Sequence, residues 1–164
     1  FFIAASHQSM FETFFLQTLF NSPVFILKKE LLFIPIFGWY LKKIGSISIK
    51  RGQITKDNLS FYDEISSVVK SSDRPLIIFP QGTRVSPNER PPFKKGASRI
   101  YEKLNIACQP VAINSGYVWP KSGKKISNKT ITISILQRIK NDLDKEIFLK
   151  ALEGKIYSEL NLMN

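Results

Sequence analysis

The chain has 164 residues, which is enough for one domain with a buried core and too few for two. Its hydrophobic fraction of 43% excludes both a disordered chain and a chain saturated with membrane spans. Lysine and arginine number 24 against 13 acidic residues, and the resulting formal charge of +11 favours anionic partners such as nucleic acid, anionic lipid or phosphorylated substrates.

Strands and helices are predicted to alternate along the chain from the period of its hydrophobic residues. Apolar, β-branched or alternating runs predict strands at 1–5, 23–28, 46–50, 75–80, 108–114 and 129–136. Helical periodicity predicts helices at 9–20, 56–72, 96–104 and 144–160. We expect buried faces formed by Leu59, Ile65, Val68 and Val69 in the second of these and by Ile147, Phe148, Ala151, Leu152 and Ile156 in the last. This alternation predicts an α/β fold: one domain over 1–164 with a mixed, mostly parallel sheet flanked by helices.

The segment 29–45 is strongly apolar, and Pro35 and Gly38 divide it into one or two short helices. Its longest apolar stretch, "LLFIPIFGWYL", has 11 residues, whereas a helix that crosses a bilayer needs about 20. Two interpretations remain: a buried helix, or an element at a membrane surface, of which Trp39 beside Lys42 is typical.

Two features concern the ends of the chain and its thiol chemistry. The chain begins at Phe1 inside the strand-like run "FFIAAS", so we expect a fragment whose natural N-terminus lies upstream. Cys108 is the single cysteine, which excludes an internal disulfide and a multi-cysteine zinc site. Its apolar neighbours predict a buried, unreactive thiol.

The only histidine, His7, directly precedes the first predicted helix, and Glu12 follows five residues later in that helix's first turn. A carboxylate in this place can fix the imidazole tautomer and stabilise the imidazolium that forms when the ring accepts a proton. The letters "SMFE" also fit a capping box, in which Glu12 would serve only the helix start. This stretch by itself leaves both interpretations open.

A second candidate site, "FPQGTR", follows the strand at 75–80. Loops after strands are where α/β folds bind ligands. Gly82 lets backbone N–H groups approach a ligand, Thr83 offers a hydroxyl, and Arg84 offers a planar fork for a phosphate. The alternative is a turn with a solvated arginine. Two other blocks are weaker alone: "GSISIKR" ends on the surface charges Lys50 and Arg51, and "QPVAIN" indicates only a strand.

Together and in this order, "HQSMFE", "GSISIKR", "FPQGTR" and "QPVAIN" resemble the glycerolipid acyltransferase family, specifically the 1-acylglycerol-3-phosphate (lysophosphatidic acid) acyltransferases. The signature of that family is His-x4-Asp, Gly-x-x-x-Ile-x-Arg, Phe-Pro-Glu-Gly-Thr-Arg and a Pro-Val strand. Glu12 stands where the family has Asp and keeps the charge. Gln81 stands where the family has Glu; it keeps a hydrogen-bonding carbonyl and loses the charge.

The resemblance, which runs from residue 1 to about 120, implies an enzyme of phospholipid biosynthesis. Such an enzyme moves a fatty acyl group from acyl-CoA or acyl carrier protein to the free hydroxyl of lysophosphatidic acid, giving phosphatidic acid, with no metal or other cofactor. His7 would be the general base and Glu12 would orient it. The residues implied for the substrate phosphate are Arg51, Gln81, Gly82, Thr83 and Arg84, with Lys50, Lys94 and Lys95 as weaker candidates.

The resemblance also implies surroundings and leaves alternatives. We expect upstream membrane-associated helices and a location on the anionic cytoplasmic face of the inner membrane. Within the family, the acceptor could instead be glycerol-3-phosphate or a lyso-aminolipid, and the loss of charge at Gln81 makes a weakly active lipid-binding relative conceivable. A basic nucleic-acid-binding module is the alternative from another class, but most phenylalanines lie in apolar segments rather than among the basic residues, and we expect no nucleic-acid partner.

Overall fold

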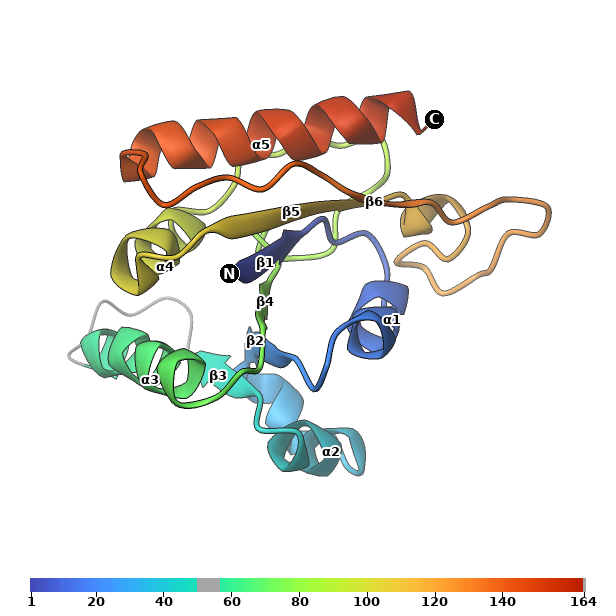
Figure 1. Cartoon of the computed structure of the whole chain (residues 1–164). Coiled ribbons are helices and arrows are strands. Elements are labelled where there is room, and N and C mark those ends of the chain that lie inside the picture. Colours follow the sequence, from blue (N-terminus) through green and yellow to red (C-terminus); the bar gives the residue numbers. More distant parts are fainter. Residues whose placement is uncertain (50–56, 164) are drawn as a thin grey trace.

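The computed structural model describes residues 1–49 and 57–163, and these contain a six-stranded sheet with the order β3-β2-β4-β1-β5-β6 (Figure 1). The five strands from β3 to β5 run parallel to their neighbours, and β6 pairs antiparallel with β5. The mixed, mostly parallel sheet predicted from the sequence is therefore confirmed. The strands are β1 (Phe2–Ala5), β2 (Val24–Lys28), β3 (Ile47–Ile49), β4 (Leu76–Ile78), β5 (Cys108–Ile113) and β6 (Ile133–Ile135).

Helices cover both faces of the sheet, as parallel strands require, because each return of the chain needs a crossover connection. They are α1 (Phe11–Leu19), α2 (Phe37–Lys43), α3 (Asp57–Ser71), α4 (Gly96–Leu104) and α5 (Lys145–Leu162), with the 3₁₀ turns η1 (Lys29–Phe33) and η2 (Ser115–Tyr117). The alternation along β1 shows both faces: Phe2 and Ala4 belong to the larger core cluster, which also holds residues of α3, α4 and α5. Ile3 and Ala5 belong to the smaller cluster, together with Leu16 of α1.

The last strand and the last helix differ in part from the sequence prediction. The strand predicted at 129–136 is only Ile133–Ile135, because β5, its pairing partner, ends at Ile113 opposite Ile133. Ile147 was predicted to face the core, but 58% of it is exposed. It lies about 100° around the helix from the buried Phe148 and so points past the packed face.

The other predicted core positions have mixed outcomes. Ile65 is buried, and Val68 and Val69 pack partly buried against the larger cluster, whereas the side chain of Leu59 lies outside the described part of the chain. Cys108 is fully buried as predicted, and burial raises the pKa of its thiol, which keeps it protonated and unreactive.

Segment 29–45 forms η1 and α2, as the interrupting Pro35 and Gly38 predicted. A Cβ on Gly38 would lie 2.1 Å from the carbonyl oxygen of Leu32, so only glycine allows α2 to fold back so closely on η1. Leu41 is buried, but Ile36 and Trp39 are 85% and 66% exposed. The interpretation of this segment as a buried helix is therefore wrong for most of its apolar side chains. No helix among the described residues is long and apolar enough to span a membrane.

Candidate active site

Three loops meet at one edge of the sheet because β4, β1 and β5 lie side by side and run parallel. Their carboxyl ends share that edge, where α/β folds place ligand sites. The loop after β1 carries His7, the loop after β4 carries the "FPQGTR" block, and the turn after β5 begins at Asn114. Sequence blocks that lie about 70 and 100 residues apart therefore become neighbours.

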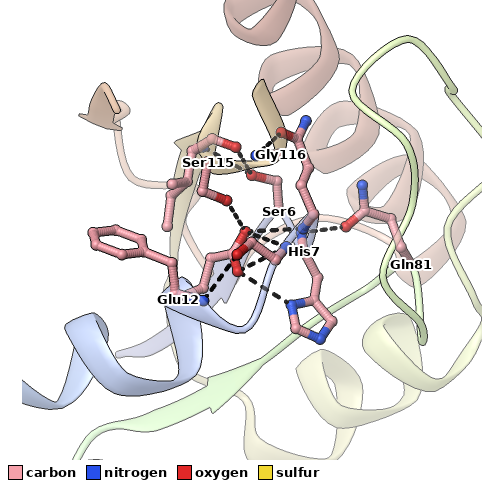
Figure 2. A network of polar contacts seen from close by, with 10 residues as sticks. Ser6, His7, Glu12, Gln81, Ser115 and Gly116 are labelled. Atoms are coloured by element: carbon pink, nitrogen blue, oxygen red, sulfur yellow. Dashed lines mark hydrogen bonds and ion pairs between the residues drawn. The ribbon is translucent and has the colours of Figure 1, made fainter. Parts of the chain in front are cut away.

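Glu12 is fully buried in the first turn of α1 and is surrounded by hydrogen-bond donors (Figure 2). Its Oε1 accepts hydrogen bonds from the backbone N–H groups of Gln8 at 2.9 Å and Ser9 at 3.1 Å, and its Oε2 accepts one from Ser9 at 3.0 Å. The hydroxyl of Ser115 also donates to Oε1. These donors stabilise a negative charge in a site from which water is excluded.

His7 faces this carboxylate. Its Nδ1 lies 3.6 Å from Glu12 Oε2, slightly beyond a hydrogen bond, and makes no other hydrogen bond to the described residues. Catalytic hydrogen bonds are often this long before substrate binds. The ring stacks on Phe79 with centroids 4.1 Å apart, and Figure 2 shows Nε2 on the side of the ring away from Glu12. The imidazole ring is therefore held by its stacking on Phe79, with Nδ1 toward the carboxylate and Nε2 on the opposite side.

The capping-box interpretation of "SMFE" is realised only in part, because α1 has Met10 rather than Ser9 as its N-cap. Glu12 accepts from the N–H of Ser9, as the acid of a capping box does, while Ser9 Oγ accepts from the N–H of Phe11 at 3.0 Å. The same carboxylate holds the turn that carries His7 and faces the imidazole. One carboxylate thus both holds the turn before α1 and faces the imidazole.

Gln81 binds the backbone of His7. Only 2% of Gln81 is exposed, and its Oε1 accepts a hydrogen bond from the N–H of His7 at 2.7 Å. On the other side, the N–H of Val85 donates to the carbonyl of His7 at 2.9 Å. Gln81 of the "FPQGTR" block and Val85, the residue after it, therefore hold the backbone of His7 from both sides. The burial of Gln81 favours support of the His7 backbone over direct contact with a phosphate.

The other residues predicted to bind phosphate lie at different depths. Gly82 has a φ of 74°, which only glycine adopts without strain, and its N–H donates to the carbonyl of Phe79 at 2.9 Å. Thr83 is exposed and Arg84 is half-buried, so both can be reached by a ligand. Lys94 and Lys95 are exposed at the start of α4. Lys50 and Arg51 lie outside the described residues.

Ser115, Gln8 and Gly116 complete the site and were not among the residues predicted from the sequence. Besides the Ser115 bond to Glu12, the N–H of Gly116 donates to Gln8 Oε1 at 3.1 Å. A Cβ on Gly116 would lie 2.9 Å from the Gln8 Cβ, so position 116 must be glycine for the turn after β5 to pack against Gln8. The only signal in the sequence was that "NSG" follows the strand block "QPVAI".

The chemistry available to this arrangement is base catalysis. The nearby hydroxyls of Ser6, Ser9 and Ser115 are engaged with the Ile113 backbone, Phe11 N–H and Glu12 respectively, so none is presented as a nucleophile. Within residues 1–49 and 57–163, no group of three or more His, Cys, Asp or Glu side chains is placed to hold a metal ion.

Comparison with known proteins gives consistent matches. The sequence model of the family described as Acyltransferase matches residues 1–114, a range that contains all four blocks. The 1-acyl-sn-glycerol-3-phosphate acyltransferase of Pseudomonas aeruginosa is 35% identical over 127 residues, which are 74% of this chain and 47% of that protein. The Helicobacter pylori enzyme of the same name is 30% identical over 162 residues, 96% of this chain and 67% of that protein.

The fold also matches a solved structure. The crystal structure of the 1-acyl-sn-glycerophosphate (LPA) acyltransferase PlsC from Thermotoga maritima superposes with a TM-score of 0.81 at 22% identity, covering 98% of this chain and 65% of that one. The chain thus spans about half to two thirds of the length of the proteins it matches.

Proposed function

Because the chain belongs to the acyltransferase family, as its four blocks indicated, we propose that it acylates 1-acylglycerol-3-phosphate to phosphatidic acid. The observation that carries this proposal is the His7–Glu12 pair at the sheet edge, where Gln81 and Val85 hold the backbone N–H and carbonyl of His7. The names of the relatives support the acceptor, since both similar enzymes are described as acting on 1-acyl-sn-glycerol-3-phosphate.

In the proposed reaction, His7 acts as general base. Its Nε2 takes the proton from the free hydroxyl of the acceptor while the hydroxyl oxygen attacks the carbonyl carbon of the donor thioester. The new C–O bond forms, the C–S bond breaks, and the leaving thiolate takes up the proton from the imidazolium. A positioned base of this kind contributes about 10²–10⁴-fold in rate. Acyl-CoA and acyl carrier protein present the same thioester, so either donor fits this chemistry.

Glu12 makes His7 an effective base. When the ring accepts the proton, it gains a positive charge close to the Glu12 carboxylate, whose Oε2 lies 3.6 Å from Nδ1 of the ring. The donors on Glu12 come from backbone groups and Ser115 that are already in place, so little reorganisation accompanies the proton transfer. Phe79 stacks on the ring and keeps it in this orientation.

For the acceptor phosphate we propose the outer part of the "FPQGTR" loop. Arg84 provides a planar, two-pronged donor and Thr83 a hydroxyl, both accessible, on a loop whose tight turn at Gly82 exposes backbone. Arg51, Lys50, Lys94 and Lys95 stay as further candidates for this role.

We also propose that the protein acts on the anionic, cytoplasmic surface of the inner membrane, through a patch on η1 and α2. This patch, hereafter the η1–α2 patch, consists of Phe33, Ile34, Ile36 and Trp39, all exposed. Lys42 and Lys43 follow in the same helix, and Lys43 Nζ lies 5.0 Å from the Trp39 ring centroid. Exposed apolar side chains bordered by lysines suit the boundary between acyl chains and anionic headgroups.

Acyl transfer by the purified protein tests the proposed function. Both thioester donors should be assayed against 1-acylglycerol-3-phosphate, glycerol-3-phosphate, a lyso-aminolipid and an unphosphorylated monoacylglycerol. We expect phosphatidic acid as the main product and a loss of about 10²–10⁴-fold in kcat for His7→Ala. Transfer that persists at the wild-type rate in His7→Ala, or that favours an unphosphorylated acceptor, would contradict the proposal.

A further inference from the structure

The last helix, α5, contacts the segment between β4 and α4 through one line of polar side chains. Glu153, Tyr157 and Asn161, hereafter the α5 stripe, are four residues apart and so lie on successive turns of one side of the helix. They span about 12 Å at 1.5 Å per residue. Next to them, the apolar face of α5 is buried in the larger core cluster, which keeps the helix itself in place.

The first two members of the α5 stripe hold the backbone of the segment 90–93. Glu153 Oε2 accepts a hydrogen bond from the N–H of Phe93 at 2.6 Å, and the Tyr157 hydroxyl donates to the carbonyl of Pro91 at 2.5 Å. The Tyr157 ring also packs edge-on against Phe93, with centroids 4.9 Å apart. Burial raises the pKa of Tyr157 to about 12, so its hydroxyl remains a donor at neutral pH.

The third member holds a side chain. Asn161 Oδ1 accepts hydrogen bonds from Arg90 Nε at 3.2 Å and Nη2 at 2.9 Å, and the same guanidinium lies 5.5 Å from the Tyr157 ring centroid. The segment 90–93 therefore runs antiparallel to α5. Three extended residue steps cover about 10 Å, close to the 12 Å of the stripe, so the contacts match in spacing.

The held segment is the returning arm of the loop 79–94, whose outgoing arm carries Arg84. The N–H of Lys94 donates to the carbonyl of Pro80 at 2.8 Å and joins the two arms. The sequence "RPPF" makes the returning arm stiff, because two consecutive prolines fix their φ angles. A displacement of this arm is consequently passed on to the outgoing arm. In Figure 1 the yellow-green loop between β4 and α4 reaches α5.

We propose that the α5 stripe positions the loop 79–94 and thereby sets the affinity for the acceptor phosphate, without touching the substrate. This inference rests on the proposed function, in which Arg84 binds that phosphate. It assigns a role to a helix beyond residues 1–114, outside the range matched by the family. Glu153, Tyr157 and Asn161 are thus positioning residues for Arg84.

The test compares variants that remove single contacts. Tyr157→Phe removes the hydroxyl and keeps the ring, Asn161→Ala removes the acceptor for Arg90, and Asn161→Asp keeps an acceptor oxygen. Ser158→Ala, at an exposed position of the same helix, is the matched control. KM and kcat are measured with 1-acylglycerol-3-phosphate and with monoacylglycerol, together with Tm.

The Tyr157→Phe/Asn161→Ala double variant removes three hydrogen bonds, two of them from the charged Arg90 guanidinium. It should raise KM for the phosphorylated acceptor about 3- to 10-fold, because only part of this lost free energy reaches the phosphate site. Its kcat should stay within about twofold, because the variant leaves in place the bonds from Gln81 and Val85 that hold the backbone of His7. Monoacylglycerol transfer, Ser158→Ala and Asn161→Asp should remain near wild type. An unchanged KM, an equal loss with both acceptors, or a lowered Tm as the only effect would overturn the inference.

Arg84→Ala separates this failure from a failure of the proposed phosphate site. If Arg84→Ala raises KM for the phosphorylated acceptor and the α5 double variant does not, only the positioning role is lost. If Arg84→Ala changes nothing, the phosphate site itself is wrong and the inference falls with it. If the phosphate site and the positioning role are both correct, combining Arg84→Ala with the α5 double variant should raise KM by less than the product of the separate effects. The reason is that both changes act on the same contact between Arg84 and the phosphate.

Discussion

Glu12→Gln removes the charge of the carboxylate while keeping its size. Gln can retain one acceptor oxygen for Gln8, Ser9 and Ser115, so most of the local hydrogen bonds can persist. What is lost is the attraction between the carboxylate and the protonated ring of His7. Unit charges 3.6 Å apart interact by about 5 kcal/mol in an effective dielectric of about 20.

Solvent reaches part of the His7 ring, with 17% of its side chain exposed, so the effective loss should be smaller than this value. About 3–4 kcal/mol in the transition state corresponds to a fall of about 10²–10³-fold in kcat, at roughly 1.4 kcal/mol per decade. The assay is steady-state acyl transfer to 1-acylglycerol-3-phosphate, with circular dichroism and Tm as checks on folding.

Glu12→Asp is the matched control, because it keeps the charge and corresponds to the residue expected from the family signature. It should lose less activity than Glu12→Gln, even though Asp is one methylene shorter. If folded Glu12→Gln turned over at nearly the wild-type rate, Glu12 would only cap the turn that holds His7, and the pairing of base and carboxylate would have to be abandoned.

Three further outcomes are expected. Arg84→Lys keeps the charge but loses the planar fork, so kcat/KM for the phosphorylated acceptor should fall about 10-fold or more, nearly as far as in Arg84→Ala; a near-normal Lys variant would exclude bidentate phosphate binding. Ile36→Ser/Trp39→Ser should weaken co-sedimentation with anionic vesicles, and wild-type binding should decrease with salt; equal binding to neutral vesicles at all salt concentrations would remove electrostatics from the account. Ser115→Ala leaves the buried Glu12 with one donor fewer and should lower Tm and kcat together; wild-type values of both would show that this bond is dispensable.

Local patterns in the sequence were sufficient for most of the elements and for placing His7 beside Glu12. The spacing of apolar residues and the β-branched side chains identified strands such as β4, because both patterns depend on which side chains of a segment are buried. His7 and Glu12 could be paired because they are five residues apart across a helix start, where the local backbone brings them together. The order of the four blocks then pointed to the family before any contact was known.

Tertiary structure decided which distant groups support that pair. Ser115 reaches Glu12 from 103 residues away, and Gln81 reaches the backbone of His7 from 74 residues away. These contacts depend on the strand order β4-β1-β5, which brings three loops to one edge. Periodicity along one segment carries no information about its neighbours in a sheet. The sequence placed Gln81 among the residues for the phosphate and gave no sign that it is buried against the backbone of His7.

The same limit applies to α5 and to the η1–α2 patch. Hydrophobic periodicity indicated an amphipathic last helix, but it placed Ile147 on the wrong face and gave no sign that Glu153, Tyr157 and Asn161 contact the loop after β4. Likewise, the apolar run around Ile36 has the same sequence pattern whether its side chains are buried or exposed. Only the packing of the whole chain determines which apolar surface is covered and which stays exposed.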